Sequence, residues 1–66
     1  MNTHVDLTAR ERDVLVLVVD GCTTREIARQ LSISSHTVDT HLRRMRRKLG
    51  ARCRADLVRI ALLTSI

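Results

Sequence analysis

Residues 24–49 read TREIARQLSISSHTVDTHLRRMRRKL, and this stretch decides the fold. Two sets of apolar residues recur in it at the spacing of one helix face. The first set is Ile27, Ala28 and Leu31, and the second is Val38, Leu42, Met45 and Leu49. Residues 32–34 interrupt the pattern, so the stretch predicts two helices joined by a tight turn. That layout is typical of a helix-turn-helix, whose second helix enters the major groove of DNA.

Upstream of this stretch, two signals predict where a first helix begins and ends. Thr8 and Glu11 fit a capping box, in which the hydroxyl and the carboxylate each accept a backbone N–H at the helix start. Gly21 can adopt the left-handed conformation that ends a helix, so the helix should run to about Asp20. Residues 14–19, VLVLVV, favour a strand by propensity alone. We expect a helix there, because the flanking signals are helical and no second strand is available for pairing.

Similar residues mark the next two helices. Thr23 and Glu26 form a second capping box, which should open the helix that contains the first apolar set. Ser34 or Ser35 should cap the following helix, and Gly50 should end it.

A last helix should begin near Cys53 or Arg54 and run to about Leu63, while residues 1–6 form a loose N-terminal arm. No linker, repeat or low-complexity segment divides the chain. We therefore expect residues 1–66 to form a single all-α domain, a four-helix bundle that contains a helix-turn-helix.

The composition narrows the function as well as the fold. The chain has 66 residues and no Phe, Tyr or Trp, so its core must be aliphatic. A domain of this size buries only about 60% of its unfolded surface, so it needs compact helices or a partner. The lack of aromatic rings argues against modules that stack nucleic-acid bases on side chains, such as RNA-recognition sheets.

The charge is distributed unevenly along the chain. The formal net charge is +5, but residues 1–30 carry four basic and five acidic side chains, whereas residues 31–66 carry eight basic and two acidic ones. Eleven of the twelve basic residues are Arg. A cationic half of this kind indicates a polyanionic partner that is met by one face.

Several other classes of site are not indicated. Cys22 and Cys53 are the only cysteines, which does not fit a disulfide scaffold. Together with His36 and His41 they offer zinc-binding atoms, but at spacings unlike any compact zinc motif, so we expect neither a metal nor another cofactor. Residues 14–19 are too short to cross a membrane. A reducing cytoplasm is the expected location.

The spaced pattern across the chain resembles the LuxR/FixJ-type (GerE-like) DNA-binding domain of bacterial transcription regulators. The resemblance covers about residues 7–62. The matching residues are Leu7-Thr-Ala-Arg-Glu-Arg-Asp-Val-Leu15, Gly21, Glu26-Ile-Ala28, Ile33-Ser34, Thr37-Val38, His41 and Lys48-Leu-Gly50. The resemblance implies a bundle in which the third helix reads DNA and the fourth commonly contacts a second copy.

Three positions depart from the usual pattern of that family. Asp39 stands where Lys or Arg is common, and a carboxylate repels phosphate but can accept a hydrogen bond from cytosine. Cys53 replaces an Asn or Ser cap, and Val16 replaces a residue that is usually polar and exposed.

The third helix, over about residues 35–49, should read the bases. Its face opposite the apolar set carries the expected base-reading residues, which are His36, Asp39, Thr40 and Arg43. The family resemblance places base contacts at the last three of these. Arg43 can grip guanine through two hydrogen bonds, although contact with phosphate alone is an equal alternative.

A larger set of residues is expected to bind phosphate. These are Thr23, Thr24, Arg25, Thr37, Arg44, Arg46, Arg47 and Lys48, with Arg52 and Arg54 on the same cationic flank. The hydroxyls and amides at the start of the second helix suit an anion, helped by the helix dipole. Plain helix capping is the alternative for the threonines, and a solvated face is the alternative for the charges.

The last helix carries more apolar residues than one core face needs. They stand at positions 57, 58, 60–63 and 66, so part of this surface should meet a second copy. The expected interface residues are Leu57, Ile60, Ala61 and Leu63.

The sequence therefore favours a regulator of transcription that binds double-stranded DNA at specific sites as a homodimer. The alternative is a protein-interaction helix-turn-helix that docks on RNA polymerase or a partner regulator. Asp39 favours the alternative, and the cationic flank opposes it. No nucleophile–base pairing or phosphate loop is present, so we do not expect an enzyme.

Overall fold

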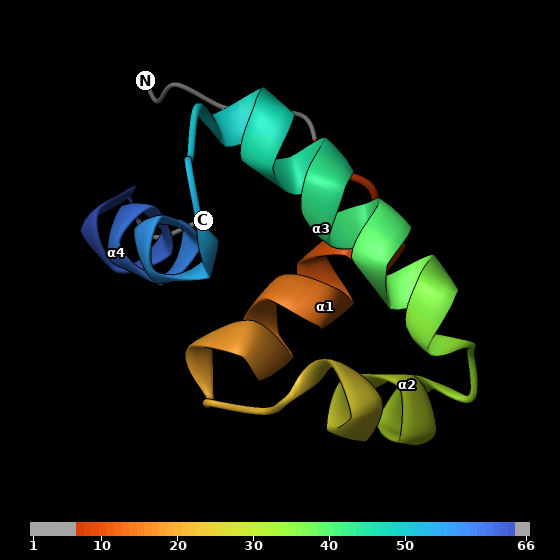
Figure 1. The fold of residues 1–66 in the computed structure, drawn as a ribbon. Helices are drawn as coiled ribbons and strands as arrows, with labels where there is room; N and C mark the ends of the chain where they lie inside the picture. The colour runs from red at the N-terminus through yellow and green to blue at the C-terminus, as the bar shows by residue number, and fades with distance from the viewer. Residues whose placement is uncertain (1–6, 65–66) are drawn as a thin grey trace.

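The computed structural model describes residues 7–64, which form four helices and no strand (Figure 1). The helices are α1 (Ala9–Val19), α2 (Thr24–Leu31), α3 (Ser35–Leu49) and α4 (Arg54–Thr64). The predicted all-α fold is confirmed, including the helical state of residues 14–19. The expected N-terminal arm, residues 1–6, lies outside the described residues.

Three helices begin at the predicted caps. The Thr8 hydroxyl accepts the Glu11 backbone N–H at 3.1 Å, and the Glu11 carboxylate accepts the Thr8 N–H at 2.9 Å. Thr23 and Glu26 repeat this pair of bonds at 3.1 and 2.8 Å. Ser34, rather than its neighbour, caps α3 by accepting a backbone N–H at 3.0 Å. These bonds satisfy donors that a helix start leaves without partners.

The helix ends also follow the prediction. Gly21 after α1 and Gly50 after α3 have φ angles of 88° and 70°, in the left-handed region that glycine tolerates best. The turn between α2 and α3 uses a serine instead, because Ser32 adopts φ 57° and ψ 43°. A left-handed residue at this point reverses the chain within a few residues and sets α3 across α2.

The core lies around α1 and α3, each of which packs against the other three helices, whereas α2 and α4 do not pack on one another. In Figure 1 α4 lies on one side of α1, while α2 and α3 lie on the other sides. The buried apolar residues are Leu7, Val14, Leu15, Val18, Ile27, Ala28, Val38, Leu42, Met45, Leu57 and Ala61. Five of the seven residues in the two predicted apolar sets are among them. The other two, Leu31 and Leu49, are half-buried against this core.

One acidic residue, Glu11, is buried with the core. Only 1% of it is exposed, and its carboxylate lies 2.8 Å from the Nζ of Lys48 near the end of α3. Burial by itself raises the pKa of Glu11, but the hydrogen bonds from Lys48 and Thr8 and the Lys48 charge outweigh it. The pKa therefore falls below its usual value of 4.5, so the carboxylate stays ionised and holds the start of α1 to the end of α3.

A second long-range contact joins α4 to the loop before α2. The guanidinium of Arg54 donates to the Cys22 carbonyl oxygen at 2.9 Å and to the Thr24 hydroxyl at 2.7 Å. This side chain bridges two helices that do not otherwise pack together. It fixes the position of the α2 N-terminus relative to α4.

The start of α4 is organised by Asp56. Its carboxylate accepts the Arg52 backbone N–H at 3.1 Å and the Arg59 guanidinium at 3.1 Å, which lowers the pKa of Asp56. Cys53 is exposed, and its carbonyl accepts the first helical N–H, from Leu57. Across residues 7–64, no helix has the length and apolar character needed to span a membrane.

Candidate nucleic-acid interface

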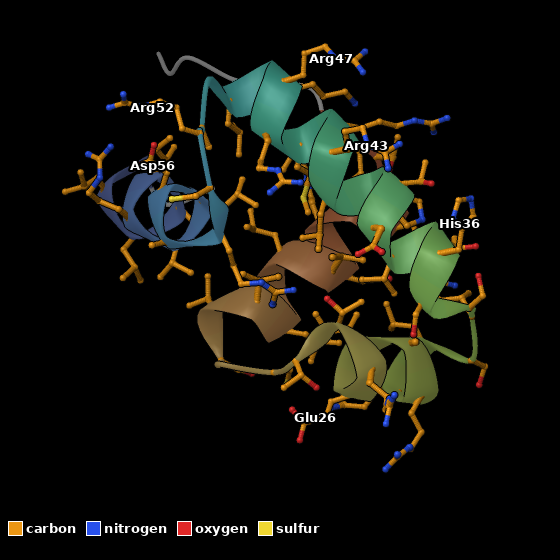
Figure 2. The ribbon with its side chains drawn as sticks, in the orientation of Figure 1. Glu26, His36, Arg43, Arg47, Arg52 and Asp56 are labelled. Atoms are coloured by element: carbon orange, nitrogen blue, oxygen red, sulfur yellow. The ribbon has the colours of Figure 1, made fainter. Side chains whose placement is uncertain are left out.

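The outward face of α3 holds the predicted base-reading residues. Val38, Leu42 and Met45 are buried, which turns the opposite side of the helix to solvent. His36, Asp39 and Arg43 are exposed on that side. Figure 2 shows His36, Arg43 and Arg47 along the edge of α3 that points away from α1 and α4. A helix with its long polar side chains free on one face has the form that a major groove admits.

Thr40 is the half-buried member of this group. Its hydroxyl donates to the His36 carbonyl oxygen at 3.1 Å, within its own helix. The hydroxyl proton is thereby used, so Thr40 offers an acceptor oxygen and a methyl group. The methyl group suits contact with a thymine methyl.

Three of the predicted phosphate-binding residues, Thr23, Thr24 and Arg25, lie at the start of α2. Arg25 is exposed, whereas the Thr23 hydroxyl caps α2 and the Thr24 hydroxyl accepts a hydrogen bond from Arg54. A hydroxyl that already accepts a bond can still donate its own proton. Capping is therefore part of the role of Thr23, and Thr24 keeps a donor for an anion.

The start of α3 is capped in a similar way. The Thr37 N–H donates to the Ser34 hydroxyl oxygen, and the two hydroxyls lie 2.9 Å apart. No acidic residue lies in the first turn of α3, so nothing there competes with a phosphate. The predicted role of Thr37 stays a prediction.

The later part of α3 supplies most of the positive charge. Arg43, Arg44 and Arg47 are exposed, and Arg46 is half-buried. Asp39 is the one acidic residue of the helix. The face is therefore cationic with a single carboxylate near its middle.

Two cations of the predicted flank have other partners. Lys48 is directed to the buried Glu11, because a carboxylate removed from water needs a counter-charge. Arg54 is directed to Cys22 and Thr24. The Lys48 side chain therefore links α3 to α1, and its predicted contact with phosphate stays a prediction.

The predicted interface on α4 is corrected in part. Leu57 is 0% exposed, so it lies in the core and cannot contact a partner, and Ala61 is only 8% exposed, so it belongs mainly to the core. Ile60 is half-buried, and 73% of Leu63 is exposed. The exposed Leu62, which was not among the predicted interface residues, lies beside it.

Cys22, Cys53, His36 and His41 are not gathered into one metal site. The Cys22 sulfur accepts a hydrogen bond from Gln30 at 3.7 Å, and Cys53 is exposed. His41 is half-buried, and its Nδ1 atom has no hydrogen-bond partner. Within residues 7–64 no group of three or more His, Cys, Asp and Glu side chains is placed to hold a metal ion.

Sequence reasoning missed the two long-range bridges made by Lys48 and Arg54. Their partners lie 37 and 30–32 residues away along the chain. Periodicity and capping patterns are local, so they carry no signal for such contacts. Burial of the Glu11 carboxylate would have indicated a cationic partner, but the sequence pattern does not show that Glu11 is buried.

Comparison with known proteins identifies the family. The chain matches the bacterial regulatory proteins of the luxR family over residues 5–61. It belongs to that family. The family consists of transcription regulators with a DNA-binding helix-turn-helix domain and not of enzymes, which confirms the expectation that this chain is not one.

Two curated relatives illustrate the match. The chain is 48% identical over 56 residues to the transcriptional regulatory protein MctR of Rhizobium johnstonii, covering 85% of this chain and 26% of MctR. It is 46% identical over 52 residues to the spore germination protein GerE of Bacillus subtilis, covering 79% of this chain and 70% of GerE. The LuxR-family chain thus spans about a quarter of MctR but most of GerE.

Solved structures agree with the fold. The dimeric VqmA of Vibrio cholerae, described as a LuxR-type receptor, has a domain that superposes with a TM-score of 0.87 at 39% identity. The match covers 89% of this chain and 27% of VqmA. A phage VqmA bound to DPO gives a TM-score of 0.89 at 32% identity, over 96% of this chain and 29% of the other.

Proposed function

We propose that this LuxR-family domain regulates transcription by binding double-stranded DNA at specific sites, with α3 in the major groove. The observation that carries the proposal is the outward face of α3, where His36, Asp39 and Arg43 project with Thr40 beside them. In this arrangement Arg43 reads guanine through its O6 and N7 atoms, and Asp39 accepts from the amino group of cytosine. The relatives that carry this domain are DNA-binding regulators.

Phosphate contacts flank these base contacts. The residues proposed to make them are Thr23, Thr24, Arg25, Thr37, Arg44, Arg46 and Arg47. They lie at the N-termini of α2 and α3 and along the later turns of α3. Helix N-termini and arginines both favour a phosphate group. A bacterial regulator of this kind acts in the cytoplasm.

We further propose that two copies bind one operator through α4. Ile60 and Leu63 form the contact that remains after Leu57 and Ala61 are assigned to the core. A two-fold dimer sets two recognition helices about 34 Å apart, so the operator should be an inverted repeat. VqmA, which contains a similar domain, is a dimer.

The test is selection of bound duplexes from a randomised library, followed by titration of the selected site at several salt concentrations. We expect an inverted-repeat motif and, for about eight phosphate contacts per dimer, a slope of log K against log salt near −7. Recovery of no motif, together with an affinity that does not change with salt, would reject the proposal.

A second candidate function is docking on RNA polymerase. Asp39 is the observation that favours it, because an exposed carboxylate in the middle of the recognition face repels phosphate. If this function holds, Asp39→Asn should leave DNA binding unchanged and weaken capture of purified polymerase.

A further inference from the structure

A groove of about 420 Å³ lies between α1 and α4, on a part of the surface that the proposed DNA contacts do not use. Leu15, Val19 and Ala61 form its apolar base. Val16 and Leu62 stand at its edges with 60% and 66% of their surface exposed. Large aliphatic side chains exposed around an apolar groove mark a surface that binds another protein.

The charged residues of this groove are arranged symmetrically about Val16. Arg12 precedes Val16 by four residues and Asp20 follows it by four, so the two charges lie about 6 Å from it in opposite directions along the helix axis. Both side chains are exposed. If a second copy of α1 lies antiparallel across Val16, each positive charge meets a negative charge of the other copy. Such a surface is therefore complementary to itself.

These two charges differ from the other charges of α1. Glu11 is paired with Lys48, and Asp13 lies 3.6 Å from Arg10. Neither the Arg12 nor the Asp20 side chain makes an ion pair within residues 7–64. Asp20 also stands at the C-terminal cap of α1, where the helix dipole disfavours a negative charge and no basic residue lies in the last turn. A cation brought to Asp20 from outside would relieve this cost.

We propose that a second copy of this chain occupies the groove, with the two α1 helices antiparallel across a two-fold axis at Val16. In that pairing Arg12 faces the partner's Asp20, and Asp20 faces the partner's Arg12. Val16 packs on its own copy, and Leu62 covers the edge of the contact. Each contact occurs twice, as an interface with two-fold symmetry requires.

This contact is separate from the α4 contact proposed for operator binding. Ile60 and Leu63 do not line the groove, and neither does any residue of α3. The two contacts therefore use different residues, although Leu62 of the groove is the chain neighbour of Leu63. Because the surface is small, the association belongs to the weak, reversible class of interfaces.

The experiment is sedimentation equilibrium with charge reversals, in a Leu63→Glu background that removes the α4 contact. Arg12→Asp and Asp20→Arg should each raise the dissociation constant of self-association about tenfold, since each opposes like charges twice. An equimolar mixture of the two single variants should associate as tightly as the parent, because a mixed pair restores both attractions. The double variant should also recover.

Val16→Glu should abolish the association, with Arg43→Ala as the control that leaves it unchanged. Circular dichroism of every variant shows that the fold is retained. DNA affinity of the Arg12→Asp, Asp20→Arg and Val16→Glu variants for one half-site should stay unchanged, which separates this contact from the proposed function. A mixture no tighter than its components, or a Leu63→Glu parent that stays monomeric at all concentrations, would overturn the proposal.

Discussion

The α2–α3 side of this domain and its α1–α4 side use apolar residues in different ways. In α2 and α3 the apolar residues form one stripe, and the opposite face is polar or cationic. In α1 and α4 they are spread around the helix, so Val16, Leu62 and Leu63 remain exposed while Val14, Leu15 and Leu57 are buried. A single apolar stripe shows from the sequence alone which face of a helix is buried and which is exposed. Apolar residues spread around a helix indicate that it contacts more than the core.

The largest expected effect tests this difference within α4. Leu57→Ala should destabilise the domain by about 2–5 kcal/mol, because it empties space in a core that no other side chain can fill. Leu63→Ala should change the free energy of unfolding by no more than about 0.5 kcal/mol, because that side chain is exposed. Urea denaturation followed by circular dichroism measures both. Equal effects would mean that α4 has no distinct core and surface sides.

The next effect concerns the contact that joins the two sides. The folded pKa of Glu11 lies below its unfolded value, so its stabilisation is complete above the unfolded pKa and is lost as pH falls through the folded pKa. Glu11→Gln should cost about 2–3 kcal/mol at neutral pH and little in strong acid. Unfolding free energies measured at neutral pH and below pH 4 test this. A cost that does not depend on pH would show that the Glu11 charge contributes nothing.

On the recognition side, Arg43→Ala should weaken binding to the selected operator by about 1–3 kcal/mol and relax the preference at one base pair. Arg44→Ala is the matched control, because we expect it to weaken binding to all sequences alike. Binding of both variants to a library of single-base changes gives the comparison. Identical profiles for the two variants would remove the base-reading role from Arg43.

The smallest expected effect concerns Arg54, which links α4 on one side of the domain to the start of α2 on the other. Arg54→Gln should weaken DNA binding by about 0.5–1.5 kcal/mol, because the Thr24 hydroxyl loses the bond that orients it. If Arg54 acts only by positioning, the salt slope should stay the same, whereas a lost phosphate contact would reduce it by about 0.9. Arg52→Gln, which removes a charge without an equivalent bridge, is the control.

The two sides also differ in what could be predicted from the sequence. Thr8, Thr23 and Ser34 marked helix starts correctly, because capping is a local interaction within three residues. The buried stripe of α3 was equally visible, since it recurs at the helical period. The exposed face of α3 followed from that stripe.

The α1–α4 side was predicted less well. Leu57 and Ala61 were expected to meet a partner but are buried, because the position of α1 decides which side of α4 is covered. The pairing of Glu11 in α1 with Lys48, 37 residues away in α3, was not predicted either. Such pairings depend on the tertiary arrangement, which local patterns do not encode.

The two bridges made by Lys48 and Arg54 also bear on the rate at which this domain unfolds. Helices and short turns make up most of the molecule, and local contacts of this kind form quickly. The bridges close loops of 37 and 30 residues, so they can form only after the helices have docked. Interactions that form after the transition state act mainly on the unfolding rate. Loss of either bridge should therefore shorten the lifetime of the native domain while refolding stays fast.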